Sequence, residues 1–390
     1  VAQVTPATTT CITMPNLERG VHSFEVWAGA HRSNRAFVDV QFCRPLASFT
    51  PIPSPAAAPT TEAPALDSTN ISEERATFID IGANLLDPMF QGIYNGSTKH
   101  SGDLEQVLER AAEHGVSTIL VTAGSVEESR ESLSLLKRLK DRQGTSSAGH
   151  KLPRLLTTVG VHPTRCSDMG SSDASASACI QDLAECCRAA QAAGALAALG
   201  ECGLDYDRLQ FCGKDEQLKG FRAQLELATE LKLPLFLHCR NAEPDFSNIM
   251  REFLPGLAGG VVHSFTGSLP ELQGVLELGL YVGLNGCSLK TGENLDVAAQ
   301  VPLARLLLET DAPWCEIRPT HASHSLVRTT LPSFKRDKFK PGSPVKGRCE
   351  PWQMVQVAEV VAALNECSVD HVARQVHLNT RKLFRLPHDA

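Results

Sequence analysis

Polar residues of the kinds that bind metal ions occur along this chain, each within or just after a short apolar run. In chain order they are Asp80, Asn84, His162, Glu201, His238, His263 and Asp311. A single histidine in such a place is usually a hydrogen-bonded rim residue, and a single aspartate is usually a helix N-cap. Two His, one Glu and one Asp from four different runs, however, form a mixed nitrogen and oxygen set that suits Zn²⁺, Mn²⁺ or Mg²⁺. We therefore predict a site for divalent cations with the ligands Glu201, His238, His263 and Asp311.

This ligand set also indicates a type of reaction. Glu201 has two carboxylate oxygens and can bridge two cations, which places it at the centre of a dinuclear site. Cations about 3.5–4 Å apart can hold a phosphate group and lower the pKa of a bound water molecule. Asp311 would then bind one cation and orient or deprotonate that water, and His162 would contact the phosphate or the leaving oxygen. Because the same arrangement would serve any metal-assisted hydrolysis, the spacing alone leaves the substrate open.

The elements that must position these residues are short apolar strands that alternate with amphipathic helices. Strands that are apolar along their whole length are typical of a parallel sheet buried on both faces. Eight such units favour a closed (β/α)8 barrel, the TIM barrel, in which the carboxyl ends of the strands meet at one rim. The chain has no G-x-G-x-x-G motif opening a helix near its start, which argues against a dinucleotide-binding fold. The predicted strands span residues 77–83, 117–123, 154–161, 196–201, 234–239, 260–265, 279–285 and 305–310.

The first 76 residues have a different character. Residues 45–66 hold six Pro and six Ala among 22 positions, so we predict a Pro/Ala/Thr-rich linker over residues 45–76 and a barrel domain over 77–390. Residues 1–44 contain two runs with strand-like alternation, which resemble the last strands of an immunoglobulin-like or fibronectin-like module. We interpret this short β-rich segment as a domain remnant or a mis-joined gene model without a part in catalysis. The chain begins at Val1, and we expect an incomplete or processed N-terminus.

Composition limits the partners. The net charge is −7 and the pI is near 6.0, so the basic field of many nucleic-acid binders is absent, and any nucleic-acid contact must be local or bridged by cations. No run of 18 apolar residues occurs, so we expect no membrane span. Thirteen scattered cysteines without a CxxC pair favour reduced thiols and a nuclear or cytoplasmic location. No stable protein partner is predicted, and the oligomeric state is left open.

Seven segments of the chain resemble, in order, the conserved blocks of the TatD-type DNases, most closely those of the eukaryotic branch. They are FIDIGANL, TVGVHPTRC, GECGLDYDRLQFC, PLFLHCRN, GGVVHSFTGS, LYVGLNGCSLKT and LLLETDAPWCEI, and the resemblance covers roughly residues 77–386. It implies a metallo-dependent hydrolase on a TIM barrel that acts on DNA as a 3′–5′ exonuclease and endonuclease. The family's metal ligands fall on Glu201, His238, His263 and Asp311.

One departure from related barrels concerns the first strand. Many of them carry H-x-H there as metal ligands, and this chain has Gly82 and Asn84 at the matching positions, as the branch it resembles does. One of two cations would then rely on Glu201, Asp311 and either Asp80 or Asn84. Such an oxygen-rich site is harder, so we expect two ions with Mg²⁺ or Mn²⁺ favoured and Zn²⁺ as the alternative.

Residues that could contact a nucleic-acid substrate lie near these ligands in the sequence. Arg240, Lys290 and Asn84 are candidates for substrate binding. The segment from Arg318 to Arg348 holds eight Lys or Arg against one acidic residue, and it either holds phosphates along the rim or is a solvated loop. Aromatic side chains can stack on bases, although rim or core packing is an equal explanation. The aromatic candidates are Tyr206, Phe211 and Trp314.

Two other functions stay open beside the deoxyribonuclease. The first is a metal-dependent deacylase or amidohydrolase on the same barrel. Several such enzymes carry a carbamylated lysine on the fourth strand, where this chain has Glu201. The second is a scaffold that has lost activity, against which the complete ligand set argues.

Overall fold

The computed structural model describes residues 77–143, 152–170 and 172–387, together with three short strands nearer the N-terminus. Those strands, β1 (Thr10–Cys11), β2 (Glu25–Ala28) and β3 (Val38–Asp39), pair antiparallel in that order. The linker predicted at 45–76 lies outside the described residues. The chain divides into a unit of residues 1–70 and a unit of residues 71–390, and the second unit contains all the candidate site residues.

The second unit is built on an eight-stranded sheet in which neighbours pair in chain order. Each of these strands runs parallel to the neighbours with which it pairs. The sheet closes on itself because Ala83 bridges Ala312, and Asp311 N donates to Gly82 O at 2.8 Å. The predicted TIM barrel is therefore confirmed. Its strands are β4 (Phe78–Ala83), β7 (Val116–Val121), β8 (Arg154–Val159), β9 (Leu196–Asp205), β10 (Leu235–Arg240), β11 (Gly260–Val262), β12 (Tyr281–Leu284) and β13 (Leu306–Leu308).

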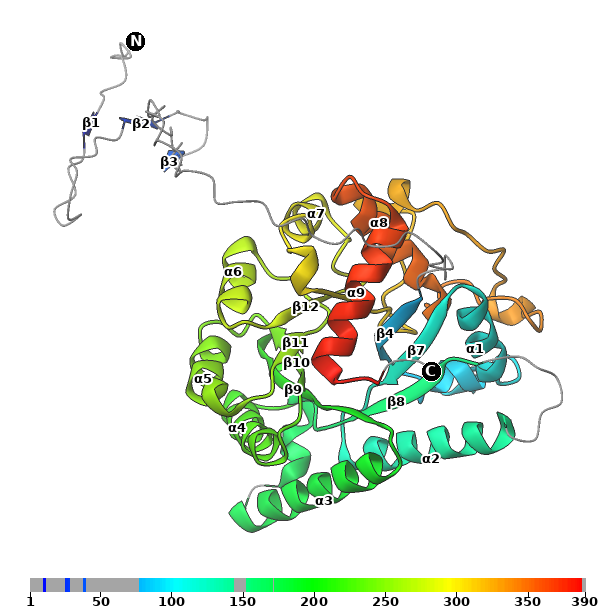
Figure 1. Cartoon of the computed structure of the whole chain (residues 1–390), viewed down its shortest axis with the longest axis horizontal. Coiled ribbons are helices and arrows are strands. Elements are labelled where there is room, and N and C mark those ends of the chain that lie inside the picture. The colour runs from blue at the N-terminus through cyan, green and yellow to red at the C-terminus, as the bar shows by residue number, and fades with distance from the viewer. Residues whose placement is uncertain are drawn as a thin grey trace, which may run out of the picture. The chain divides into compact units, whose positions relative to one another are not determined.

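Helices surround these strands, as Figure 1 shows. One apolar core fills the space between strands and helices, and a second, smaller core fills the barrel itself. Between β4 and the first helix lies a small hairpin, β5 (Ile93–Tyr94) and β6 (Ser97–Thr98). The helices are α1 (Leu104–Glu113), α2 (Val126–Gln143), α3 (Asp173–Ala192), α4 (Lys214–Leu231), α5 (Asp245–Phe253), α6 (Leu269–Glu277), α7 (Gly292–Ala298), α8 (Met354–Leu364) and α9 (Val369–Phe384).

The last helix, α9, closes one mouth of the barrel. Leu383 and Phe384 at its end belong to the inner core. The Asn379 amide donates to Leu306 O at the first residue of β13, and Arg385 donates to Lys232 O just before β10. Because these contacts lie at the amino ends of strands, α9 closes the mouth opposite to the rim that carries the candidate site.

Two predicted strand boundaries differ from the structure in an informative way. The strand predicted at 196–201 continues to Asp205, because β9 keeps pairing with β10 beyond an irregularity. The strand predicted at 305–310 ends at Leu308, and the chain then turns at Asp311, whose φ of 49° lies in the left-handed region. The aspartate in ETDAP therefore does not cap a helix. It sits in a tight turn at the rim.

None of the helices of the described residues is long and apolar enough to cross a bilayer. All the cysteines from Cys166 onward are free thiols. The nuclear or cytoplasmic location stays a prediction.

A buried ionic network fixes the end of the long segment between β13 and α8. Arg348 is fully buried, donates to both carboxylate oxygens of Asp103 at 2.7 and 2.6 Å, and donates to Glu350 at 2.8 Å. Arg110 of α1 donates to the other oxygen of Glu350 at 2.9 Å. The network joins the start of α1 to the end of the Arg318–Arg348 segment.

Removing the central guanidinium should therefore cost far more than removing a surface one. In Arg348→Ala the buried carboxylate of Asp103 loses its main partner and that of Glu350 keeps only Arg110, so we expect the free energy of unfolding to fall by about 3–5 kcal/mol. Urea unfolding followed by tryptophan fluorescence measures the loss. Arg222→Ala, which removes an exposed pairing with Glu252, is the matched control and should change stability much less. Equal stability losses in the two variants would contradict the network's role.

Candidate metal centre

Three histidines converge on one carboxylate oxygen at the carboxyl end of the barrel. His263 Nε2 lies 2.7 Å from Glu201 Oε1, His238 Nδ1 lies 2.8 Å from it, and His162 Nε2 lies 3.4 Å from it. Glu201, His238 and His263 each offer one ligand atom, and these atoms lie within 4.8 Å of one another. The structure thus brings together three of the four predicted ligands. A mixed set of two imidazoles and a carboxylate fits a divalent cation.

The geometry of β9 explains how Glu201 reaches this point. Leu235 of β10 pairs with Leu199, but Leu237 pairs with Cys202, so β9 holds one extra residue between these pairs. Such a bulge redirects side chains and is common beside active sites. Gly203 follows with a φ of 146°, and a Cβ there would lie 1.9 Å from His238 O. Gly203, the second glycine of GECGLD, is therefore required for the close approach of β9 to β10.

Charge at the centre is shared between Glu201 and the histidines. Burial acts to raise the pKa of Glu201, but the charges of His263 and His162 and hydrogen bonds from His238 and His263 outweigh it and hold that pKa well below its ordinary value. Burial acts to lower the pKa of His263, but the carboxylates of Glu201 and Glu309 raise it well above the ordinary value. For His162 burial dominates and lowers the pKa to about 4.

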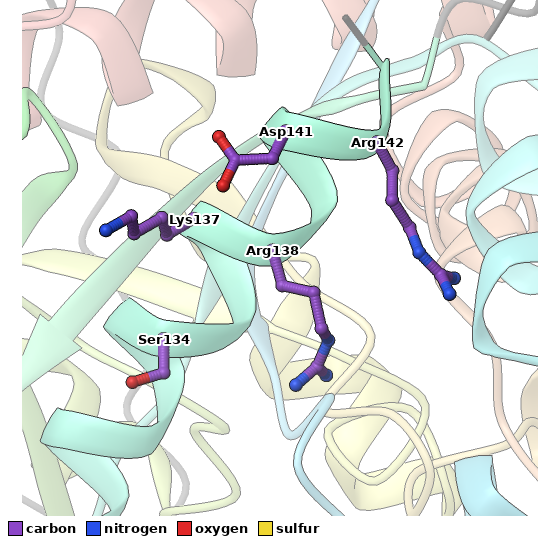
Figure 2. A pocket seen from close by; sticks show the side chains of 5 residues that line it. All are labelled: Ser134, Lys137, Arg138, Asp141 and Arg142. Atoms are coloured by element: carbon purple, nitrogen blue, oxygen red, sulfur yellow. The ribbon is translucent and has the colours of Figure 1, made fainter. Parts of the chain in front are cut away.

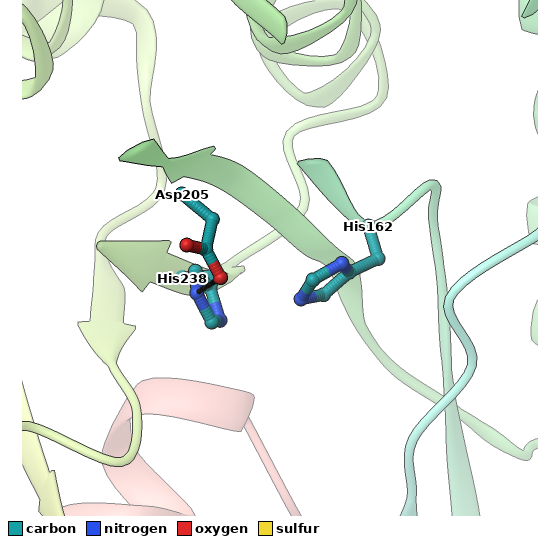
Figure 3. Close-up of side chains that lie close together, drawn as sticks. All are labelled: His162, Asp205 and His238. Carbon is teal, nitrogen blue, oxygen red and sulfur yellow. Dashed lines mark hydrogen bonds and ion pairs between the residues drawn. The ribbon is translucent and has the colours of Figure 1, made fainter. Parts of the chain in front are cut away.

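Asp205 belongs to the same centre and was missed by sequence reasoning. Its Oδ2 lies 3.0 Å from His238 Nε2, and the residue is almost fully buried at the end of β9. Figure 3 shows Asp205 beside His238 with His162 facing them, and these three also form a group that could hold a metal ion. The signal was present: positions 201, 203 and 205 follow one another at the two-residue period of a strand face. The predicted strand, however, ended at 201.

Asp311, the fourth predicted ligand, lies near the three-residue group but outside it. Its charge interacts with His263 and Glu201, and burial raises its pKa to about 6. Oδ1 accepts a hydrogen bond from the Asn84 amide at 2.9 Å, and Oδ2 accepts one from the Cys315 thiol at 3.3 Å. Both oxygens are thus oriented by neighbours.

Asp80 in β4 and Asn84 just after it serve the closure of the barrel. Asp80 Oδ1 accepts from Thr310 N at 3.0 Å and Oδ2 accepts from the Thr310 hydroxyl at 2.5 Å. Asn84 donates to Asp311 and accepts from the Thr122 hydroxyl at 2.7 Å. Among the described residues, the groups of His, Cys, Asp and Glu that could hold a metal ion do not include Asp80, which was one of two alternative ligands, with Asn84, for the second cation. Asp80 and Asn84 hold the end of β13, and Asn84 does so through Asp311 itself.

Two of the candidate substrate residues, Arg240 and Lys290, lie at or after the carboxyl ends of strands. Arg240, half-buried, ends β10, and Lys290, exposed, follows β12. The pKa of Cys287 is lowered, chiefly by a hydrogen bond with Cys315, and the charges of Arg240 and Lys290 contribute while that of Asp311 opposes. The side chains of Arg240 and Lys290 therefore lie near the thiol of Cys287, as Asp311 does.

The three aromatic candidates differ in how accessible they are. Phe211 is 64% exposed and Trp314 is 51% exposed, so neither is a core residue. Tyr206 donates to Asp245 at 2.7 Å, and the Lys214 ammonium lies 4.8 Å from the centre of its ring. Two of the three rings are thus open to a stacking partner, and the third is engaged within the protein.

A separate hollow lies on the outer side of α2 and contains none of these residues. Figure 2 shows its lining, which comes from α2 alone. The lining residues are Ser134, Lys137, Arg138, Asp141 and Arg142. Since it lacks a convergent set of buried polar groups, this hollow is not a candidate active site.

Known proteins with similar sequences share the whole barrel. The sequence pattern of the TatD related DNase family matches residues 79–385. The Schizosaccharomyces pombe protein named Deoxyribonuclease Tat-D is 43% identical over 310 residues, covering 79% of this chain and 95% of that protein. The Erwinia tasmaniensis protein named 3′-5′ ssDNA/RNA exonuclease TatD is 36% identical over 310 residues, covering 79% of this chain and 99% of that protein.

Solved structures agree with the sequence relatives. A crystal structure from Saccharomyces cerevisiae, described as an uncharacterized amidohydrolase, matches with a TM-score of 0.73 at 34% identity and covers 79% of this chain and all of that one. A TatD family hydrolase from Entamoeba histolytica matches with a TM-score of 0.72 at 32% identity, covering 79% of this chain and 98% of that one. With the family pattern matched across the barrel, the conclusion is that this chain belongs to the TatD family of DNases.

Proposed function

We propose that this protein is a divalent-metal-dependent deoxyribonuclease that hydrolyses phosphodiester bonds as a 3′–5′ exonuclease, an endonuclease or both. The observation that carries the proposal is the convergence of His162, His238 and His263 on Glu201 at the open end of the barrel. The names of the Schizosaccharomyces and Erwinia relatives support DNA as the substrate. A metal-dependent deacylase or amidohydrolase on the same barrel is less well supported, because among the relatives described above only the Saccharomyces structure is called an amidohydrolase, and that protein is uncharacterized.

The proposed ligands are Glu201, His238, His263 and Asp311. We propose two ions, Mg²⁺ or Mn²⁺ in preference to Zn²⁺, because the Asp311 side of the site offers oxygen rather than nitrogen. When bound, the cations supply Lewis acidity toward a phosphate oxygen and toward the attacking water. Asp311 is the proposed base that orients or deprotonates this water. Asn84 and Cys315 hold its carboxylate in place, and its pKa of about 6 allows it to be ionised at neutral pH.

His162 is proposed as a neutral hydrogen-bond donor. The Thr164 backbone N–H donates to His162 Nδ1 at 3.2 Å and the Thr164 hydroxyl lies 2.7 Å from the same nitrogen, an arrangement that suits a ring proton on Nε2, the nitrogen that faces Glu201. With a pKa of about 4 the ring is uncharged at neutral pH. His162 would thus donate from Nε2 to a phosphate oxygen or the leaving oxygen without giving up a full proton.

The proposed path of the DNA runs over the rim. Arg240 and Lys290 are the nearest candidates for phosphate contacts, and the exposed rings of Phe211 and Trp314 can stack on unpaired bases. The Arg318–Arg348 segment adds seven exposed Lys or Arg and returns to the rim where Cys349 N donates to Pro313 O at 3.0 Å. In an acidic protein this local basic surface is the proposed holder of the DNA backbone beyond the cleaved bond.

The central test is cleavage and its loss. With Mg²⁺ or Mn²⁺, the wild-type protein should shorten a 3′-labelled single-stranded oligonucleotide, and Glu201→Gln should abolish this because the oxygen shared by three imidazoles loses its charge. Glu277→Gln, an exposed glutamate of α6, is the control and should cleave normally. Cleavage confined to ester or amide substrates would support a deacylase. Neither cleavage nor uptake of any divalent cation would support an inactive scaffold.

A second test separates His162 from the ligands. In His162→Ala one donor to the transition state is lost, and we expect kcat to fall about 100-fold or more. The dissociation constant for Mn²⁺, measured by calorimetry, should stay the same within a factor of two or so, because the proposed ligand set is intact. A large loss of Mn²⁺ affinity would instead identify His162 as a ligand.

A third test concerns the basic segment. Reversing the charges of Lys335, Lys338 and Lys346 to Glu should raise KM for long oligonucleotides and flatten its dependence on salt concentration. Hydrolysis of bis(p-nitrophenyl) phosphate, which is too small to reach the segment, should be unchanged. The same reversal at Lys137, Arg138 and Lys140 of α2 is the matched control. If both triple variants bind long DNA equally well, the segment is only a solvated loop.

A further inference from the structure

Each of the two histidines closest to Glu201 presents its second ring nitrogen to another buried carboxylate. His238 uses Nδ1 toward Glu201 and places Nε2 3.0 Å from Asp205 Oδ2. His263 uses the opposite nitrogen, Nε2, toward Glu201 and places Nδ1 3.5 Å from Glu309 Oε2. The same pairing thus occurs twice, on different strands and with the ring nitrogens exchanged.

We propose that Asp205 and Glu309 are positioning residues that prepare His238 and His263 to bind the catalytic cation. An imidazole that binds a cation through one nitrogen keeps its proton on the other, and a carboxylate acceptor for that N–H fixes both the tautomer and the ring orientation. Asp205 would hold the proton of His238 on Nε2, and Glu309 would hold that of His263 on Nδ1. This inference rests on the proposed function, because it concerns the same metal centre.

Asp205, the carboxylate that faces His238, is itself held in place by hydrogen bonds. Asp205 Oδ1 accepts from Asp207 N at 3.1 Å, and Arg208 lies 3.5 Å from Oδ2. Gln217 of α4 binds the Asp205 backbone on both sides, accepting from its N–H at 2.7 Å and donating to its carbonyl at 2.9 Å. The carboxylate therefore has little freedom to leave the ring of His238.

Glu309, the carboxylate that faces His263, lies in a more enclosed environment than Asp205. Glu309 is fully buried, and its Oε1 accepts from Ser264 N and from the Asn285 amide. Neither Glu309 Oε2 nor His263 Nδ1 has a hydrogen-bond partner among the described residues, and the two atoms face each other at ion-pair distance. An acceptor and a possible donor that are both buried and otherwise unmatched indicate that they serve one another.

Gly82 provides the space for the carboxylate of Glu309. A Cβ on Gly82 would lie 2.8 Å from Glu309 Oε2, closer than non-bonded atoms normally come. The position where related barrels carry a histidine ligand thus lies against the carboxylate of Glu309 in this chain. Any side chain there would displace Glu309 from His263.

The alternative is that Asp205 binds an ion directly, since His162, Asp205 and His238 form a group of metal-binding character. The two assignments differ in the number of ions. A positioning residue changes the affinity of an ion that still binds, whereas a ligand takes one ion away with it.

The experiment is a titration of the metal-free full chain with Mn²⁺, followed by the electron paramagnetic resonance of the free ion. Asp205→Asn and Glu309→Gln keep the size of the side chain and remove its charge. We expect each to weaken Mn²⁺ binding about 10- to 100-fold with the number of bound ions unchanged. Gly82→Ala, which removes no polar group, should weaken binding as well. Asp207→Asn, an exposed neighbour of Asp205, should bind as the wild type does.

The outcomes separate the two proposals. If the wild type binds no Mn²⁺ and cleaves DNA with no divalent cation, the proposed function fails. If the wild type binds Mn²⁺ and the three variants bind it equally tightly while circular dichroism shows them folded, the positioning inference is overturned. Loss of one whole ion in Asp205→Asn, with the other bound as before, would make Asp205 a ligand. Should Glu309→Gln not fold, the same Mn²⁺ titration of Gly82→Ala tests the role of Glu309. Should Asp205→Asn not fold, the titration of Asp205→Glu tests the role of Asp205.

Discussion

The candidate centre depends on one buried carboxylate oxygen that is surrounded by imidazole rings. Glu201 Oε1 has three ring nitrogens within 3.4 Å, and burial alone would favour its protonation. It stays charged because His263, whose pKa is raised well above its ordinary value, lies beside it and because His238 and His263 donate hydrogen bonds to it. A cation that entered would take over this neutralising role from protons, so ion binding and proton release are coupled at this point.

The barrel serves this centre through its closure. Residues of β4 and residues just after β13 lie more than 200 positions apart in the sequence, yet Asp80 binds Thr310 and Asn84 binds Asp311. These bonds fix the turn that carries Asp311, whose left-handed φ has no support from a following helix. The first strand thus contributes by holding Asp311, the proposed base, in place.

Much of this could be predicted from the sequence, and the failures have physical causes. The apolar runs and the polar residues at their ends indicated the barrel and its rim, because a strand buried on both faces tolerates few polar side chains except where it opens to solvent. Asp205 was not predicted as a site residue because the bulge lengthens β9 beyond its apolar part. Glu309 was not predicted as a site residue because it directly follows an apolar run and so resembled the end of a strand. The partners of Asp80 and Asn84 are set by ring closure, which no local pattern reveals.

The position of α9 has a consequence for how the protein is made. Leu383 and Phe384, almost the last described residues, complete the core inside the barrel. During synthesis these residues leave the ribosome after every strand of the barrel, so the barrel interior cannot be filled while they are still inside the exit tunnel. The nascent protein therefore carries an unfinished barrel until this helix has emerged.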